Sequence, residues 1–233
     1  MKIQGAVALV TGANRGIGAE FVRQLHARGA AKVYAASRGG ADAAIAGVQG
    51  VTLDVTDERQ AARLAAELTD VDLLVNNAGI ATGASLVTGD FAEIRREFET
   101  NVFGSLSLTR AFARNLASNG GGAVLNVLSA ATWFAAPGAT AYAATKAAAW
   151  SMTDGLRVEL ASQRTQVLGL HMAVVDAGMG VDAQGPKVSV DAVVSHALDG
   201  LEAGAAEVLV DDVSRQLKSN LHQDPIERYA GLI

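Results

Sequence analysis

The chain has 233 residues, a net charge of -5 and no cysteine. Its length suits one sizeable domain, its acidic balance disfavours nucleic acid as a partner, and the lack of cysteine excludes disulfides and thiolate metal sites. Half of the residues are hydrophobic but only 5% are aromatic, which is typical of a core built around a buried parallel sheet.

Short apolar runs alternate with longer amphipathic segments along the whole chain. This pattern predicts an α/β protein made of strand–helix–strand units with parallel pairing, in one doubly wound, Rossmann-like domain spanning residues 1–233. Strands are expected at residues 6–11, 32–36, 51–54, 73–76, 123–128, 166–172 and 207–210. Helices are expected at residues 17–28, 57–68, 91–118, 141–161 and 190–203.

The amino-terminal residues lack the basic start, apolar stretch and cleavage site of a signal peptide. No uninterrupted apolar stretch has the roughly 18 residues of a membrane-spanning helix. We therefore expect a cytoplasmic protein without a membrane segment. Asp211 and Asp212 are expected to be solvated. No metal site is expected, because the histidines fall on no ligand spacing: His26, His171, His196 and His222.

A glycine-rich turn joins the first expected strand to the first expected helix. Residues 11–18 read Thr-Gly-Ala-Asn-Arg-Gly-Ile-Gly, so backbone N–H groups and the positive end of a helix dipole meet there. Gly12 permits the sharp turn, Gly16 allows a pyrophosphate to approach, and Gly18 allows close packing. The turn predicts a dinucleotide site that includes Asn14, Arg15 and Ile17. The spacing is G-x3-G-x-G rather than the commonest G-x-G-x-x-G, and a tight turn without a ligand is the alternative.

Ser37 and Arg38 follow the second expected strand. An acidic residue there binds the ribose 2′-hydroxyl of NAD, whereas an arginine accommodates the 2′-phosphate of NADP. Arg15 could supply a second cation. The sequence therefore predicts NADP(H), unless both arginines are merely solvated.

Tyr142 and Lys146 are four residues apart, so a helix places the phenol and the ammonium on one face. A free phenol titrates near pH 10, and an adjacent cation favours the phenolate. We expect Lys146 to lower the pKa of Tyr142 and make it a general acid or base. The alternative is a packed tyrosine beside a solvated lysine.

Five motifs in register carry a family resemblance: residues 11–18, Asn76 to Gly79, Asn101, Ser129, and Tyr142 with Lys146. In order and separation, including the thirteen residues from Ser129 to Tyr142, they resemble the short-chain dehydrogenase/reductases over nearly the whole chain. The resemblance implies a seven-stranded parallel sheet of order 3-2-1-4-5-6-7 with helices on both faces. It also implies hydride transfer between a nicotinamide cofactor and a carbonyl or alcohol carbon.

The resemblance implies a role for each motif residue. Tyr142 would exchange the proton, Ser129 would hydrogen-bond the substrate oxygen, Lys146 would bind the nicotinamide ribose, and Asn101 would hold a water that links the lysine to solvent. The cofactor would also contact Asp54, Val55, Asn77, Ala78 and Gly79. As alternatives, Ser129 could cap a turn, Asn101 could be an ordinary helix residue, and Asp54 could cap the next helix.

The chain departs from the family pattern after the sixth expected strand. Residues 172–177 contain neither the family's Pro-Gly pair nor the Thr that follows it. The backbone of Val175 could still hold the nicotinamide carboxamide. Residues 178–189 are expected to form a substrate lid loop, since Gly178 to Pro186 contains three glycines and a proline. An apolar substrate pocket is expected from four residues, with Ala81 and Thr82 beside them: Trp133, Phe134, Met172 and Met179.

The expected function is that of an NADP(H)-dependent carbonyl reductase or alcohol dehydrogenase. Its substrate would be a small to medium ketone or aldehyde with an apolar or aryl group, and Trp133 and Phe134 could equally belong to the core. A nucleotide-sensing protein without catalysis is the main alternative, and an isomerase or epimerase shares the same dyad. In the family the helices at 91–118 and 141–161 form the subunit interface, so a homodimer or homotetramer is expected.

Overall fold

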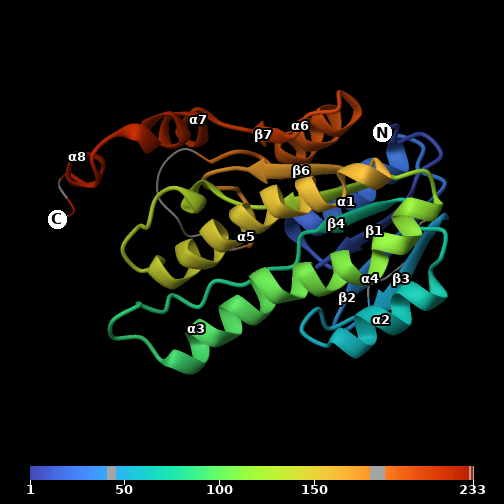
Figure 1. Ribbon diagram of the computed structural model, residues 1–233, viewed down its shortest axis with the longest axis horizontal. Helices are drawn as coiled ribbons and strands as arrows, with labels where there is room; N and C mark the ends of the chain where they lie inside the picture. Colours follow the sequence, from blue (N-terminus) through green and yellow to red (C-terminus); the bar gives the residue numbers. More distant parts are fainter. Residues whose placement is uncertain (41–45, 179–186, 231, 233) are drawn as a thin grey trace.

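The computed structural model describes residues 1–40, 46–178, 187–230 and 232. They form one parallel sheet of order β3-β2-β1-β4-β5-β6-β7 between two layers of helices (Figure 1), which confirms the predicted fold. The strands are β1 (Val7–Thr11), β2 (Lys32–Ser37), β3 (Val48–Thr52), β4 (Leu73–Asn76), β5 (Ala123–Val127), β6 (Gln166–His171) and β7 (Glu207–Leu209).

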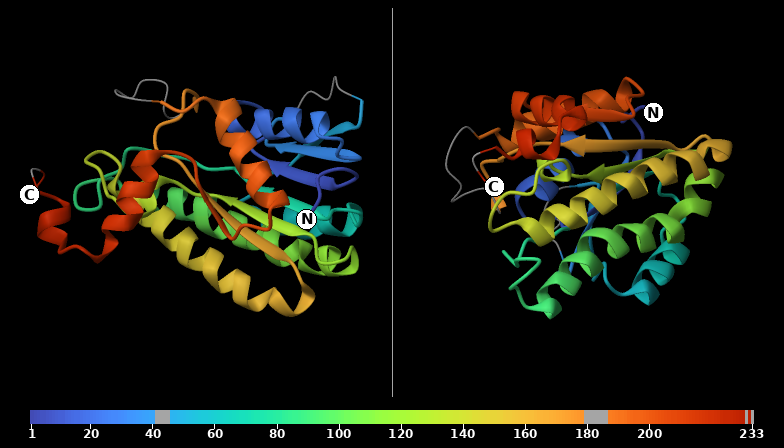
Figure 2. Two further views of the ribbon diagram at one scale, coloured as in Figure 1. Left: turned by 90° about the horizontal axis from the view of Figure 1, so that it is seen from above. Right: turned by 60° about the vertical axis from the view of Figure 1, so that its left-hand side comes forward.

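Two helices cover one face of the sheet and three cover the other (Figure 2). The first layer contains α1 (Gly16–Ala27) and α6 (Val190–Glu202). The second contains α2 (Glu58–Glu67), α4 (Gly104–Ser118) and α5 (Thr140–Glu159). Short 3-10 turns lie at Ala130–Thr132, Ala161–Gln163 and Asn220–His222.

Alternation of side chains along the buried strands divides the core in two. In β1, Ala8 and Val10 pack with α1 and α6, whereas Leu9 packs with α2 and α4, because successive side chains of a strand point to opposite faces. All seven strands are parallel, so their carboxyl ends and the loops that follow meet at one edge of the sheet. Ligands of open α/β sheets bind at that edge.

The third strand lies earlier in the chain than predicted. It runs from Val48 to Thr52 rather than over 51–54, and it pairs Val33 with Val48 and Ser37 with Thr52. Gln49 and Gly50 are exposed. This strand is at the sheet edge, where pairing with β2 requires no buried apolar run, and the sequence pattern therefore misses its start.

The predicted helix at 91–118 is three consecutive elements. A π-helical turn (Glu99–Phe103) separates α3 (Phe91–Phe98) from α4. A Cβ added at Gly104 would lie 2.9 Å from Cγ2 of Val55, so the chain approaches the loop before α2 very closely here. Such single π turns occur within longer helical segments, and they are frequent at functional sites.

Two carboxyl-terminal helices were not predicted: α7 (Asp212–Ser219) and α8 (Pro225–Arg228). Both are too short for a clear apolar period, and side-chain caps from Asp211 and Asp224 begin them. Asp212 is exposed, as expected, but Asp211 is half-buried, and its carboxylate accepts hydrogen bonds from the N–H groups of Ser214 (2.7 Å) and Ala173 (2.8 Å). Within the described ranges, no helix is both long enough and apolar enough to span a membrane.

Candidate active site

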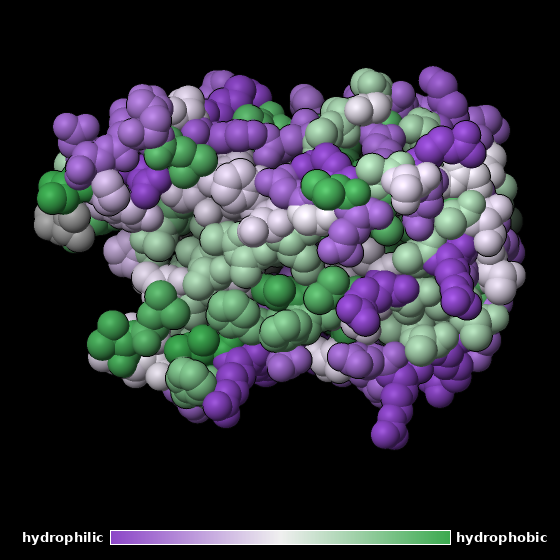
Figure 3. Space-filling view, in the orientation of Figure 1, coloured by the Kyte–Doolittle hydropathy of each residue, from purple (hydrophilic) through white to green (hydrophobic). Residues whose placement is uncertain are grey.

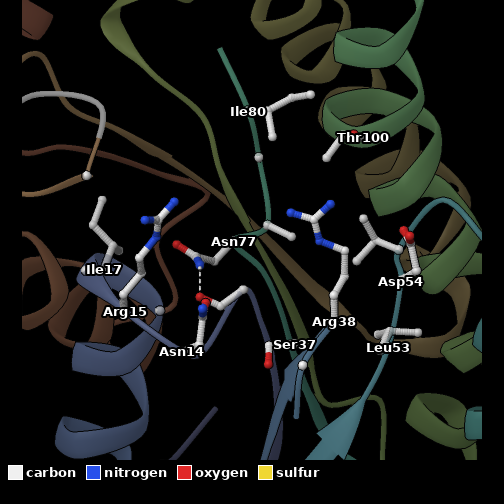
Figure 4. Close-up of a pocket in the computed structure, with 18 of the residues that line it drawn as sticks. Asn14, Arg15, Ile17, Ser37, Arg38, Leu53, Asp54, Asn77, Ile80 and Thr100 are labelled. Atoms are coloured by element: carbon white, nitrogen blue, oxygen red, sulfur yellow. Dashed lines mark hydrogen bonds between the residues drawn. The ribbon is translucent and has the colours of Figure 1, made fainter. Parts of the chain in front are cut away.

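A groove of about 650 Å³ opens at the carboxyl ends of β1, β2 and β4 (Figure 4). It contains every described cofactor-site residue of the prediction except Lys146 and Val175. Its lining comprises Gly12, Asn14, Arg15, Gly16, Ile17, Gly18, Ser37, Arg38, Gly39, Leu53, Asp54, Val55, Thr56, Asn77, Ala78, Gly79, Ile80, Arg96, Thr100, Ala177 and Gly178.

The glycine turn forms one wall of the groove. Gly12 and Gly16 have φ angles of 65° and 55°, which favour glycine. A Cβ added at Gly18 would lie 2.2 Å from the carbonyl oxygen of Gly12. No side-chain cap from Arg15 satisfies the first N–H groups of α1. These groups and the helix dipole suit the pyrophosphate of a dinucleotide.

Residues 76–79 brace the turn from the neighbouring strand. The Asn77 side-chain amide donates hydrogen bonds to the carbonyl oxygens of Thr11 (2.8 Å) and Gly12 (3.3 Å), as Figure 4 shows in part. The Thr11 hydroxyl oxygen accepts from the N–H groups of Asn77 and Ala78, each at 3.0 Å. Asn76 instead points into the core and donates to Oδ1 of Asn126 at 2.9 Å.

Arg15 and Arg38 reach into the groove from the residue before α1 and from the residue after β2 (Figure 4). Between them, Ser37 is buried, and its hydroxyl has no hydrogen-bond partner among the described residues. Two guanidinium groups beside an unsatisfied hydroxyl suit a phosphate group on the adenine-side ribose. Asp54 also lines the groove and accepts from the Thr56 hydroxyl at 2.8 Å, but the cap of α2 is Asp57.

The helix α5 carries Tyr142 and Lys146 on one face, beneath the loop that follows β5. The Lys146 Nζ is buried, lies 5.6 Å from the centre of the Tyr142 ring, and donates to the carbonyl oxygen of Val127 at 2.9 Å. Ser129 lies two residues beyond the end of β5, and its Oγ accepts from the N–H of Ala131 at 3.1 Å as the cap of a 3-10 turn. Ser129 therefore caps this turn, as the alternative interpretation expected, and its side chain is also close enough to hydrogen-bond to Tyr142.

The ionisation of this pair differs from the prediction. Burial raises the pKa of Tyr142 to about 12, the Ser129 hydroxyl opposes the shift, and the charge of Glu97 adds to it. Burial also lowers the pKa of Lys146 to about 8. The predicted lowering of the tyrosine pKa by its lysine neighbour is wrong, because desolvation disfavours the charged form of both groups.

Asn101 lies in the π turn and its side chain is fully engaged. Its Oδ1 accepts from the N–H of Ile80 at 2.8 Å, and its Nδ2 donates to the Ile80 carbonyl oxygen and to the Thr145 hydroxyl, each at 2.9 Å. A Cβ added at Gly79 would lie 3.2 Å from this Oδ1 and 3.9 Å from Nζ of Lys146. Asn101 thus joins the end of the groove to α5.

The described residues predicted for the substrate pocket, Trp133, Phe134 and Met172, do not line this groove. Trp133 is buried with its ring stacked on His171 (centroids 4.1 Å apart), and Phe134 stacks on Tyr229 (4.9 Å). Met172 is buried, and Val175 pairs with Val188 in an isolated bridge. Met179 and residues 179–186 of the predicted lid lie outside the described residues.

Several residues of the site escaped the sequence prediction. Arg96, Thr100 and Ala177 line the groove. Glu97 is buried one helical turn before Asn101, a spacing that could have drawn attention to it. The Asp211 carboxylate accepts a hydrogen bond from the N–H of Ala173, within the segment that departs from the family pattern, and no local pattern links residues so far apart.

Comparison with known proteins agrees with this geometry. The family model of the short chain dehydrogenases matches residues 6–186. Carbonyl reductase 2 of Sus scrofa, an NADPH enzyme by name, is 32% identical over 186 residues, covering 77% of this chain and 76% of its own. The L-xylulose reductase of Homo sapiens is 33% identical over 184 residues, covering 76% and 75%.

A solved structure extends the likeness to the full length. A short chain dehydrogenase from Burkholderia cenocepacia J2315, crystallised in complex with NADP, is 38% identical with a TM-score of 0.94, covering 100% of this chain and 99% of that chain. The chain belongs to the short-chain dehydrogenase/reductase family of oxidoreductases.

Proposed function

We propose that this protein is an NADP(H)-dependent carbonyl reductase or alcohol dehydrogenase that interconverts a small to medium ketone or aldehyde, with an apolar or aryl group, and its alcohol. The observation that carries the proposal is the grouping of Tyr142, Ser129 and Lys146 beside Gly79, where the groove ends. The names of the carbonyl reductase and xylulose reductase relatives support the same reaction class.

NADP(H) fits the residues of the groove. The uncapped start of α1 would hold the pyrophosphate, and Arg15, Arg38 and the Ser37 hydroxyl would hold the 2′-phosphate. The NADP complex of the Burkholderia relative supports this choice. When bound, the reduced cofactor supplies the hydride that adds to the carbonyl carbon.

The protein supplies the proton and the positioning. Tyr142 O–H donates its proton to the carbonyl oxygen, and its raised pKa keeps this donor protonated at neutral pH. The Ser129 hydroxyl donates a hydrogen bond to the same oxygen and stabilises its developing charge. Lys146, with its pKa near 8, is mostly an ammonium at pH 7 and would bind the ribose hydroxyls.

Oxidation of NADPH in the presence of a panel of aryl and aliphatic ketones tests the proposal. Turnover should fall by roughly 100- to 10,000-fold in Tyr142→Phe, because a positioned general acid contributes about that much, while NADPH affinity stays near that of the parent. Tyr34→Phe is the matched control, since Tyr34 of β2 does not line the groove and its hydroxyl donates to the Asp70 carboxylate at 3.0 Å. Tyr142→Phe with parental turnover would exclude the assigned role. NADPH binding without turnover of any ketone would favour the nucleotide-sensing alternative.

A homodimer or homotetramer and a cytoplasmic location complete the proposal. The surface along α3 and α5 gathers apolar side chains (Figure 3), and Phe103 and Val158 are 50% and 78% exposed. Large apolar side chains left in water favour association. Light scattering of the purified protein that finds only monomer would contradict this part.

A further inference from the structure

Glu97 of α3 is a carboxylate that the proposed reaction does not use, yet it is 0% exposed. Its Oε1 accepts hydrogen bonds from the N–H (2.5 Å) and the hydroxyl (2.8 Å) of Thr82. Its Oε2 is buried without a hydrogen-bond partner among the described residues, and no ion pair with a described cation offsets its charge. Burying a carboxylate in this way is costly, so a compensating role is expected.

The segment that Glu97 holds leads directly to the catalytic tyrosine. Two residues after Thr82, the carbonyl oxygen of Ala84 accepts from the N–H of Ala141 at 3.3 Å. The N–H of Leu86 donates to the Thr140 hydroxyl at 3.2 Å. Residues 82–86 are thus bonded to Glu97 at one end and to the first turn of α5, just before Tyr142, at the other.

Apolar packing holds the same elements together. Ala84, Ile94 and Ala141 form a small buried cluster with Phe98 against it. It lies between α3 and α5, so the helix that carries Glu97 cannot move away from the first turn of α5 without opening that cluster. Glu97 also precedes Asn101 by one turn, and Asn101 contacts Thr145 of α5.

We propose that Glu97 is a positioning residue for Tyr142: it fastens residues 82–86 to the first turn of α5 and sets the electrostatic surroundings of the phenol. The functional part of this inference rests on the proposed role of Tyr142. The charge effect itself is a property of the folded chain, which can be measured without turnover.

The groups around Tyr142 come from three elements. Lys146 lies one turn along α5, Ser129 lies two residues beyond β5, and the charge of Glu97 on α3 acts on the phenol. Nδ1 of His171 on β6 contacts the Ser129 carbonyl oxygen at 3.1 Å, and His171 is not among the groups that shift the pKa of Tyr142. Of the effects on the pKa of Tyr142, burial is the largest and raises it, Ser129 lowers it, and Glu97 raises it. Glu97 is therefore the one described carboxylate that acts in this direction.

Glu97→Gln is the informative variant, because the amide oxygen can still accept both bonds from Thr82 while the charge is lost. Glu99→Gln is the matched control, since it removes the same charge from an exposed position at the end of α3. Thr82→Val removes one bond to the carboxylate and leaves the charge. Labelled tyrosine ring carbons, followed by NMR in each cofactor-free protein and assigned with Tyr142→Phe, report the phenolate fraction of Tyr142.

At a fixed pH near 10.5, Glu97→Gln should raise the phenolate-to-phenol ratio of Tyr142 about threefold or more, as expected for a nearby charge. Glu99→Gln and Thr82→Val should leave this ratio at the parental value. In turnover, the acidic limb of the alcohol-oxidation profile should move to lower pH by roughly half a unit in Glu97→Gln alone.

An unchanged phenolate ratio in folded Glu97→Gln would overturn the inference, and so would an equal change in Glu99→Gln. A changed ratio in a protein that reduces no ketone would uphold the charge effect and contradict the proposed function. The NMR measurement therefore tests the effect of Glu97, and the turnover measurement tests the proposed function, so that one can fail without the other.

Discussion

Replacement of Gly18 by alanine tests how the glycine turn holds its ligand. The new Cβ would lie 2.2 Å from the carbonyl oxygen and 2.8 Å from the carbonyl carbon of Gly12, and 2.6 Å from Nδ2 of Asn77. Two of these atoms are backbone, so relief requires the turn itself to move away from α1. Overpacking of this kind costs typically 1 to 3 kcal/mol.

We therefore expect Gly18→Ala to lose about 2 kcal/mol in the free energy of unfolding, which lowers Tm by roughly 4 to 8 °C for a domain of this size. Displacement of the N–H groups that would receive the pyrophosphate should weaken NADPH binding at least about tenfold, or 1.4 kcal/mol. Thermal unfolding and fluorescence titration with NADPH measure the two effects.

Gly155→Ala is the matched control for this substitution. Gly155 lies inside α5, and a Cβ added there meets no atom within 4 Å. Alanine is favoured over glycine in a helix by about 0.5 to 1 kcal/mol, so this variant should be slightly more stable with parental NADPH affinity. Parental Tm and parental affinity in Gly18→Ala would refute the steric reasoning.

Two further predictions concern charge. Arg38→Asp should weaken NADPH binding at least about tenfold and leave NADH binding equal or tighter, because a carboxylate repels the 2′-phosphate and accepts from a ribose hydroxyl. The control Arg110→Asp makes the same charge change on α4 outside the groove, and it should alter neither affinity in titrations. A parallel loss of affinity in both variants would contradict the local role of Arg38. Burial lowers the pKa of His171 from 6.5 to about 4, although the hydrogen bond between its ring and the Ser129 carbonyl oxygen opposes this shift. Between these values the unfolded chain binds a proton that the folded chain does not, so stability should fall by up to about 3 kcal/mol as pH decreases from 6.5 to 4. Urea unfolding across this pH range should show a shallower loss for His171→Gln, and equal slopes would exclude His171 as the cause.

The sequence alone determined the sheet and the frame of the site. The central strands β1, β4, β5 and β6 are mainly apolar because both of their faces are buried, and this signal is local. The glycine turn, the Ser37-Arg38 pair and the spacing of Ser129, Tyr142 and Lys146 are local as well. Each was therefore predicted with its residues, and the structure gathers the first two around one groove.

Elements whose stability depends on distant partners were decided by the tertiary structure. The edge strand β3 needs only β2 for pairing, the π turn at Asn101 follows from contacts with Ile80 and Thr145, and α7 begins at Asp211, which also holds Ala173. None of these contacts produces a periodic pattern in the amino-acid sequence.

The ionisation of the site shows the same division most clearly. Residue spacing correctly put an amine beside the Tyr142 phenol, but the direction of the pKa shift depends on how much water and which charges surround both groups. Those surroundings come from the loop after β5 and from Glu97 of α3, which meet Tyr142 only in the folded protein. Desolvation is a property of the packed neighbourhood, and a pair of side chains cannot specify it by spacing alone.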